Sequence, residues 1–421
     1  MSSCNDYHVS RRRFLSQFVG TAAMLGMPIN RLLAEIGSAH APKAESVILF
    51  WNGGGMSHLD TWDPKPGREV TGEFEPIKTS ADGIQISEIF PTLAKQMHHC
   101  SLIRSIAGTN GDHGRATYEL QTSYPQNPAI VHPGLGSFVV NESNRTSDLP
   151  SYISIGGMAP RAGYLGQRCE AYYIGLPGER DPYLAFPDGI SQVQGQRRLE
   201  VLARMNARAS QKVAAKDLKE TEVALKDAVN LMKSPALASF DLDKESPKTL
   251  ERYGSTEFGR GALLARKLIE TGVRFVQVNR GGFDNHTDVF PAMRNHGSVM
   301  DPALASLIED LSASGRLEKT LVMVLSEFGR TPKINMNAGR DHHAKVFSCL
   351  MAGGGVKGGN VIGSSDADGM EPKDRPVQVP DIHASVCHAL GIDYKKELTT
   401  PLGRPMKLVK EGSKPVMELF A

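Results

Sequence analysis

The apolar stretch "TLVMVL" at residues 320–325 decides the fold class. It is short, aliphatic and continuous rather than alternating, which is typical of a strand buried on both faces of a parallel sheet. Further stretches share this character, namely "SVILFWN" (46–52), "SLIRSI" (101–106), "YISIG" (152–156), "VRFVQVN" (273–279) and "FSCLMAGG" (347–354). The sequence therefore predicts a largely parallel central sheet.

Segments with helical periodicity lie between these stretches. They cover 255–272, 300–315 and 380–391, and the last has Asp381 near its start and Gly391 at its end, as helix termini prefer. Alternating helices and strands predict an α/β fold in which the sheet is sandwiched between helices.

Residues 190–255 differ in character. The stretch 196–233 is charged, alanine-rich and free of glycine and proline, which predicts a long exposed helix, and Ser246-Pro247 opens a second helix. We expect a helical insertion over the sheet. A protein-interaction surface is the alternative use of the same segment.

Residues 1–41 carry the order of an export signal. Arg11 and Arg12 precede Phe14, a weakly apolar stretch follows, and "SAHA" (38–41) offers small residues for cleavage. Paired arginines favour the twin-arginine route and hence a periplasmic or extracellular location. Pro42 disfavours cleavage directly after Ala41, so the cut would lie slightly earlier or not occur. A basic amphipathic helix on a cytosolic protein is the alternative.

The remaining 42–421 are expected to form a single α/β domain, since 421 residues with 40% hydrophobic content can bury a large core. The signal's net charge of +2 equals that of the whole chain, so the mature protein is near neutral, which argues against nucleic acid as a partner. No later segment has the apolar length of a membrane span. Cys349 and Cys387 lie in apolar runs and are expected to be buried, and no disulfide framework is indicated, although one bridge stays possible.

Polar residues cluster where the predicted strands end, which is where α/β sheets bind ligands. In chain order these are Asp60, Thr109, His113, Arg115, Asp284, His286, Glu327, Arg330, His342 and His343. Histidine nitrogen with carboxylate oxygen is the ligand set of a hydrolytic Zn²⁺ or Mn²⁺ site. In an extended loop, Asp284 and His286 can face one ion, and a histidine of Asp341-His342-His343 can complete the set. The alternative is that these residues cap helices and bind loop backbone.

Four stretches together resemble the bacterial family named domain of unknown function 1501 (DUF1501). They are "GGGMSHLDTWDPKPG" (53–67), "KTLERYGSTEFGRGALLARKLIETGVRFVQVNRGGFDNHTD" (248–288), "SEFGRTPKINMNAGRDHHAKVFSCLMAGGGVKGGNVIG" (326–363) and "VPDIHASVCHALGI" (379–392). The resemblance covers nearly the whole chain after the signal. It implies an alkaline-phosphatase-like fold, related to sulfatases, phosphodiesterases and phosphonate hydrolases, with a parallel sheet that carries two metals at its strand ends.

Transferred to this sequence, the resemblance implies one metal site formed by Asp284 and His286 with His342 or His343. Glu327 stands where the second site has an aspartate, and Phe328 follows where a histidine is usual. Gly54 takes the place of the first strand's aspartate, for which Asp60 is a possible substitute.

The nucleophile segment is represented by "GTNGDHGRATYELQT" (108–122), in which no hydroxyl or thiol stands at the expected position and Thr109 is nearest. The catalytic candidates are thus Thr109, His113, Arg115 and Arg330, with either arginine able to hold an anion. The resemblance implies an exported metal-dependent hydrolase of sulfate, phosphate or phosphonate esters, either small or carried by a polymer, with an altered site. A non-catalytic binding or assembly protein on the same fold is the alternative.

Overall fold

A computed structural model describes residues 43–143, 148–178, 184, 186, 189–210 and 229–420. The predicted export signal lies outside these residues, as does the middle of the helix predicted over 196–233. Within the described part of the chain, no helix combines the length and the apolar character needed to cross a membrane.

The core of the molecule is a nine-stranded sheet, and its strands confirm the predicted α/β class. Its order is β12 (Asn360–Ile362), β4 (Cys100–Ala107), β11 (Phe347–Ala352), β8 (Thr320–Leu325), β1 (Ser46–Asn52), β7 (Phe275–Arg280), β5 (Tyr152–Ile155) and β6 (Tyr172–Ile174), with β15 (Val377–Gln378) also paired to β4. Only β11 runs antiparallel to its neighbours. All six apolar stretches of the sequence are strands of this sheet.

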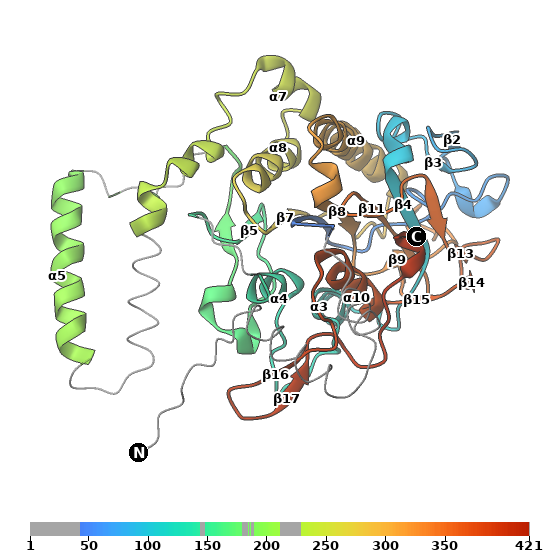
Figure 1. The fold of residues 1–421 in the computed structure, drawn as a ribbon. Coiled ribbons are helices and arrows are strands. Elements are labelled where there is room, and N and C mark those ends of the chain that lie inside the picture. The colour runs from blue at the N-terminus through green and yellow to red at the C-terminus, as the bar shows by residue number, and fades with distance from the viewer. Residues whose placement is uncertain are drawn as a thin grey trace, which may run out of the picture. The chain divides into compact units, whose positions relative to one another are not determined.

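Helices cover both faces of the sheet (Figure 1). Helices α8 (Glu257–Glu270) and α9 (Val289–Ala313) pack on one face, and α3 (His113–Thr122), α4 (Leu135–Asn141) and α10 (Val379–Leu390) lie on the other. Strand β1 divides its side chains between them, because successive residues of a strand point to opposite faces. Ile48 and Phe50 join the core on the α8–α9 side, whereas Val47 and Leu49 join the other core.

Helix α9 starts at Val289, which is well before the expected start at residue 300. The first half of α9 was not predicted because its exposed face carries polar residues, among them Arg294, Asn295 and Ser298. Pro302 lies inside the helix. Next to it, Asp301 accepts hydrogen bonds from the backbone of Thr92 and Leu93, which ties this part of the helix to the neighbouring segment.

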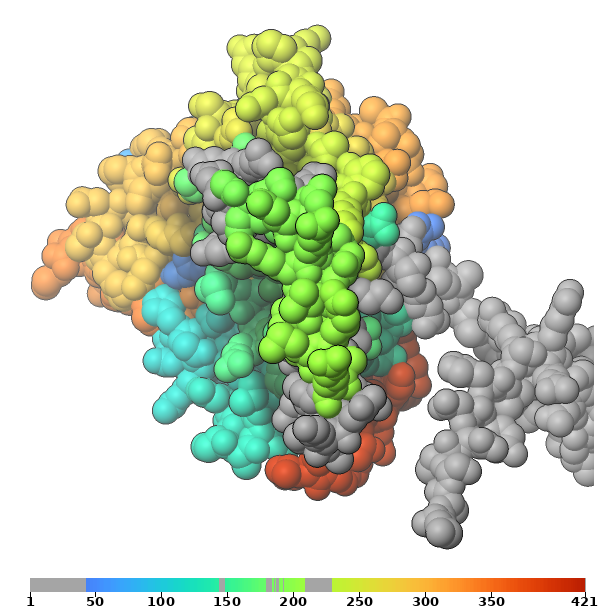
Figure 2. All heavy atoms as spheres, turned by 90° about the vertical axis from the view of Figure 1, so that its left-hand side faces the viewer, coloured from blue at the N-terminus to red at the C-terminus, as the bar shows by residue number. Residues whose placement is uncertain are grey.

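The segment predicted as a helical insertion contains α5 (Gln192–Ser210) and α7 (Pro247–Tyr253). Ser246 caps α7 by accepting a hydrogen bond from the Thr249 backbone, as the Ser-Pro pair suggested. Figure 2 shows α5 on the surface of the molecule, where Val193 and Met205 are exposed. The function of this segment stays a prediction.

The cysteines within the described residues, Cys100, Cys169, Cys349 and Cys387, are buried and unpaired. The expectation that Cys349 and Cys387 lie in the core is therefore confirmed, and these four thiols form no disulfide with one another.

Candidate metal centre

Four polar side chains converge at the carboxyl edge of the sheet. Asp284 and His286 lie on the loop between β7 and α9, and His113 is the first residue of α3, in the segment that follows β4. His342 belongs to β10 (His342–His343), which pairs antiparallel with β9 (Gly329–Arg330) just beyond β8. Parallel strands thus deliver to one place residues that are more than 200 positions apart in the sequence.

The Oδ1 atom of Asp284 is the centre of the group. The Nε2 atoms of His342 and His286 each lie 3.1 Å from it, and the Nε2 atom of His113 lies 3.3 Å from it. One ligand atom each from His113, Asp284 and His342 lies within 4.8 Å of the other two, so these three side chains could hold one metal ion.

The Nδ1 atom of each of the three histidines faces an oxygen atom, and this contact determines which ring nitrogen carries the hydrogen. The Nδ1 atom of His113 lies 2.8 Å from a Glu327 oxygen, and that of His286 lies 2.8 Å from an Asp341 oxygen. The Nδ1 atom of His342 lies 2.7 Å from the Gly111 carbonyl oxygen. Because carboxylate and carbonyl oxygens accept hydrogen bonds, each Nδ1 donates, and in the neutral ring each Nε2 keeps a lone pair.

Lone pairs therefore face one another across the group. Three Nε2 atoms and a carboxylate oxygen repel each other unless a positive charge lies among them. The Nε2 atom of His113 is buried and has no hydrogen-bond partner among the described residues. Zn–N bonds of about 2.0–2.1 Å at tetrahedral angles place neighbouring ligand atoms about 3.3 Å apart. The spacings of 3.1 Å from Asp284 to His342 and 3.3 Å from Asp284 to His113 fit that arrangement.

The carboxyl group of Asp284 is held in the ionised form, which is the form that binds a metal ion. Burial by itself would raise the pKa of Asp284, but the hydrogen bond from Arg330 and the charge of that arginine hold the pKa well below its usual range. The hydrogen bond from His286 likewise lowers the pKa of Asp341. Asp284 is 47% exposed, so the group is open to solvent on one side.

Glu327 stands behind His113 rather than among the converging atoms. Its side chain is buried, and its Oε1 atom accepts hydrogen bonds from the His113 ring and from the Gly54 backbone, both at 2.8 Å. A carboxylate in this position orients a metal-binding imidazole and raises its basicity. Glu327 was predicted as a ligand, and in the structure it supports His113, which was predicted as a catalytic residue.

The pairing of β9 with β10 separates the two adjacent histidines. His342 lies opposite Arg330 and His343 opposite Gly329, and neighbouring strand residues point to opposite sides. His343 contacts the Met370 carbonyl oxygen through Nε2 at 2.7 Å and stacks on His58. His342 is therefore the member of the pair that joins the group, and His343 does not.

Asp60 lies outside the group because it is engaged elsewhere. Its two oxygens accept hydrogen bonds of 2.9 and 3.0 Å from Arg340, and both side chains are fully buried. Arg340 also donates to the backbone of Thr331 and Val70. The pair thus fixes the hairpin that carries His342, and the expected ligand role of Asp60 does not fit its position.

Arg330 is also committed to the protein. It is almost fully buried and donates to the backbone oxygens of Gly54, Gly55 and Arg340 and, at 2.5 Å, to Asp284. The expected anion-holding role of Arg330 does not fit this geometry. Thr109 and Arg115 are exposed, the first in the segment before α3 and the second on α3, and neither side chain has a hydrogen bond to the group.

Two further positions complete the group. Asp341 orients His286, and the adjacent histidines were the signal that could have singled it out. Gly54 has a backbone φ of +115°, and a Cβ atom there would lie 2.6 Å from the Asp284 backbone nitrogen. A side chain therefore has no room at Gly54 in this backbone.

The family model described as "Protein of unknown function (DUF1501)" matches residues 44–420 of the chain. No curated protein matches it. Among solved structures it is similar to Ps i-CgsB, with a TM-score of 0.41 and 12% identity over 83% of this chain and 72% of that one. It is also similar to the PsFucS1 sulfatase from Pseudoalteromonas sp., with a TM-score of 0.37 and 13% identity over 86% and 70%.

A third structure with this likeness is the zinc complex of the C-terminal periplasmic domain of EcEptC from Escherichia coli. Its TM-score is 0.36 and its identity 9%, over 91% of this chain and 96% of that one. Similarity at this level is too distant to carry chemistry from one protein to another. The chemistry of the group at the sheet edge rests on its own side chains.

Proposed function

The chain belongs to the DUF1501 family of proteins of unknown function, and we propose that it is an exported metal-dependent hydrolase of anionic esters. The ion would be Zn²⁺ or Mn²⁺, held by His113, Asp284 and His342. The observation that supports this most is the convergence of imidazole lone pairs on an ionised carboxylate, with each imidazole oriented from behind by an oxygen atom. A cation held there would act as a Lewis acid that polarises the ester.

His286 supplies the proton transfer in this proposal. Its Nδ1–H group donates a hydrogen bond to Asp341, so its Nε2 atom can take a proton from a water molecule that attacks the ester. No serine, threonine or cysteine side chain of the described residues forms a hydrogen bond with the four converging side chains. This supports water, rather than a protein hydroxyl such as Thr109, as the nucleophile.

The substrate would be a sulfate, phosphate or phosphonate ester, small or carried by a polymer. Arg115 remains available to attract its charge, because this arginine is exposed on the first turn of α3, close in sequence to His113. An export signal of the twin-arginine type would place the reaction in the periplasm or outside the cell.

One observation favours the non-catalytic alternative. Arg330 donates to the same Asp284 oxygen on which the histidines converge, at 2.5 Å, so the carboxylate already has a positive partner. If Arg330 supplies the positive charge that the group needs, the group stabilises the fold without a metal. The protein then works through another surface. Metal content distinguishes these two functions.

The test is the metal content of protein purified without chelator, compared with an Asp284→Ala, His342→Ala double variant. The hydrolase proposal expects close to one equivalent of Zn or Mn in the parent and a loss in the variant. His98→Ala is a matched control, because His98 is an exposed histidine outside the group.

Hydrolysis of p-nitrophenyl sulfate, p-nitrophenyl phosphate and p-nitrophenyl phenylphosphonate would then be compared for the same proteins. Turnover of one ester that disappears in the double variant and persists in the His98 variant supports the hydrolase. A parent without metal would overturn it in favour of the non-catalytic function, in which the double variant is expected to lose thermal stability because it breaks the Asp284–Arg330 pair.

A further inference from the structure

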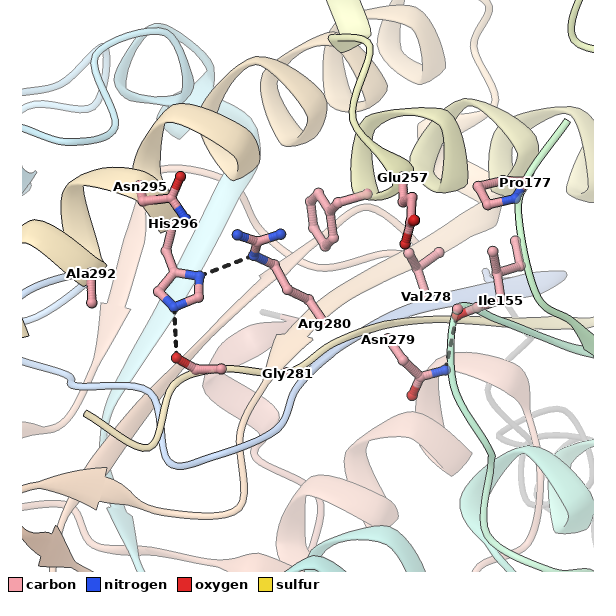
Figure 3. Close-up of a pocket in the computed structure, with 13 residues that line it drawn as sticks. Ile155, Pro177, Glu257, Val278, Asn279, Arg280, Gly281, Ala292, Asn295 and His296 are labelled. Atoms are coloured by element: carbon pink, nitrogen blue, oxygen red, sulfur yellow. Dashed lines mark hydrogen bonds between the residues drawn. The ribbon is translucent and has the colours of Figure 1, made fainter. Parts of the chain in front are cut away.

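A cavity of about 450 Å³ lies at the carboxyl ends of β5 and β7, between the start of α8 and the first turns of α9 (Figure 3). It is lined by Arg280, Gly281 and Gly282 from the end of β7, by Glu257 and Phe258 from α8, and by His296 from α9. Asp284 follows four residues after Arg280, so the cavity and the candidate metal centre are formed by the same strand and loop.

Hydrogen bonds set the direction of the Arg280 guanidinium. Its Nε atom donates to the Nδ1 atom of His296 at 3.0 Å, and the Nε2 atom of that ring donates to the Gly282 carbonyl oxygen at 2.9 Å. The ring is therefore neutral, and burial lowers the pKa of His296 to about 4, which keeps it so. Its plane stacks on Phe283. Figure 3 shows Arg280 bound to His296 in this way within the cavity.

In the part of the chain that the structure describes, the terminal nitrogens of Arg280 donate no hydrogen bond, and the guanidinium lies over the Phe258 ring at 5.9 Å from its centroid. Among the described residues, no carboxylate lies within 4.0 Å of Arg280, and neither Nη atom donates a hydrogen bond to a protein oxygen. The guanidinium is half-buried, and burial lowers the pKa of Arg280, as expected for a cation without a counter-charge. A guanidinium with two free edge nitrogens matches the two oxygens of a carboxylate, sulfate or phosphate group.

We propose that this cavity is an oxyanion-binding site, in which Arg280 holds a carboxylate, sulfate or phosphate group through its terminal nitrogens and His296 acts as the positioning residue. The start of α8 faces the same cavity and adds backbone N–H groups and the positive end of a fourteen-residue helix. The anion is either free or carried by a larger molecule such as a sulfated sugar. The site stands whether or not the metal centre hydrolyses an ester.

Glu257 sets a limit on the ligand. Its carboxylate lines the cavity with Arg280, so a bound anion meets one attractive and one repulsive charge. Removal of the repulsive charge by Glu257→Gln should therefore strengthen binding several-fold. This change leaves the hydrogen bond of Arg280 to His296 in place, and it supplies a gain of affinity that a misfolded variant would not show.

The experiment is calorimetric titration of the full-length protein with inorganic sulfate and, separately, with glucose 6-sulfate. Arg280→Gln should weaken binding at least about tenfold, which corresponds to one charge-assisted pair. The matched control is Arg316→Gln, which removes one exposed positive charge outside the cavity. The Asp284→Ala, His342→Ala variant should bind the anion as the parent does, which separates this site from the metal centre.

Each result decides the proposal. Binding of both probes, or of sulfate alone, that depends on Arg280 and survives in the metal-centre variant supports the site, and a tighter complex with the sugar identifies the larger ligand as its source. Absence of binding in the parent overturns the proposal. Binding that Arg280→Gln and Arg316→Gln affect equally, or that disappears only in the metal-centre variant, overturns it as well.

Discussion

The Nε2 atoms of His286 and His342 lie 3.1 Å apart, and the Nδ1 atom of each ring already faces an oxygen. In this position the Nε2 lone pairs of the two rings repel each other unless a proton or a cation lies between them. This contact suggests a cation-binding group, because histidines whose ring nitrogens all had hydrogen-bond partners in the protein would not bring their Nε2 atoms together.

His286 should affect catalysis more than metal binding. In the variant His286→Gln, His113, Asp284 and His342 still hold the ion, so metal content should stay near that of the parent. Loss of the proton acceptor should lower kcat by about 10²–10⁴-fold. The two quantities are measured on the same preparation. If the variant loses its metal instead, His286 is a ligand, as the sequence pattern Asp284-x-His286 suggested.

Glu327 should behave as a support for His113. Glu327→Gln keeps an oxygen acceptor for the His113 ring but removes its negative charge, so metal affinity should fall by about 10–100-fold. Competition with a chromogenic chelator measures this affinity. His113→Ala is the comparison, and it should weaken binding further because it removes a ligand atom. Equal losses in both variants would identify Glu327 as a direct ligand.

The sheet, its helices and the edge at which the candidate site lies were predictable from the sequence. Continuous apolar stretches such as 321–325 predict buried strands, since few other environments tolerate five apolar residues in a row. The sequence also placed Asp284, His286 and His342 at one edge. It could not choose between His342 and His343, because that choice depends on the register of β9 with β10, which apolar periodicity does not encode.

The partners of buried charges were also beyond sequence reasoning. Asp60 and Arg340 are 280 positions apart and pair because the folded chain leaves no water for either, a fact of tertiary packing. Arg330 looked like an anion ligand because arginine at a strand end often is one. Only the backbone carbonyls around it reveal that its donors are used.

The Asp60–Arg340 pair should contribute to stability rather than to metal binding directly. Both side chains are fully buried, so Arg340→Met leaves an unpaired buried carboxylate and should lower the free energy of unfolding by about 3–5 kcal/mol. The double variant Asp60→Leu, Arg340→Met should recover part of that loss, since it removes both charges. Urea unfolding of the three proteins provides the values. A metal loss in Asp60→Asn without loss of stability would restore Asp60 as a ligand.

Buried neutral histidines should make the metal-free protein less stable in mild acid. Burial lowers the pKa of His383 to about 4, whereas the unfolded chain binds this proton near its ordinary pKa of 6.5. As pH falls from about 6.5 towards 4, the unfolded state gains a proton that the folded state refuses, so stability decreases by about 1.4 kcal/mol per pH unit for this residue.

The variant His383→Leu should remove that contribution and reduce the pH dependence of the unfolding free energy by one proton over this interval. Urea unfolding in the presence of EDTA, at pH values between about 7 and 5, measures the slope. The comparison uses slopes, so any change of packing around the new side chain cancels. Equal slopes in parent and variant would mean that His383 is already protonated in the folded protein.

Gly54 should be required for the metal centre because of the space it leaves. Its φ is +115°, and a Cβ atom would lie 2.6 Å from the Asp284 backbone nitrogen and 2.8 Å from that of Phe283. Gly54→Ala must therefore push the Asp284 loop away and should reduce metal affinity at least about tenfold, since a displacement of a few tenths of an ångström misplaces a ligand.

Gly67→Ala is the matched control, because Gly67 also has a positive φ but nothing lies within 4 Å of its added Cβ. Both variants carry the strain of a positive φ, so a difference in metal content between them reports the contact with Asp284 alone. If both retain full metal content, the loop can yield without moving its ligand, and the position of Asp284 is set by Arg330 instead.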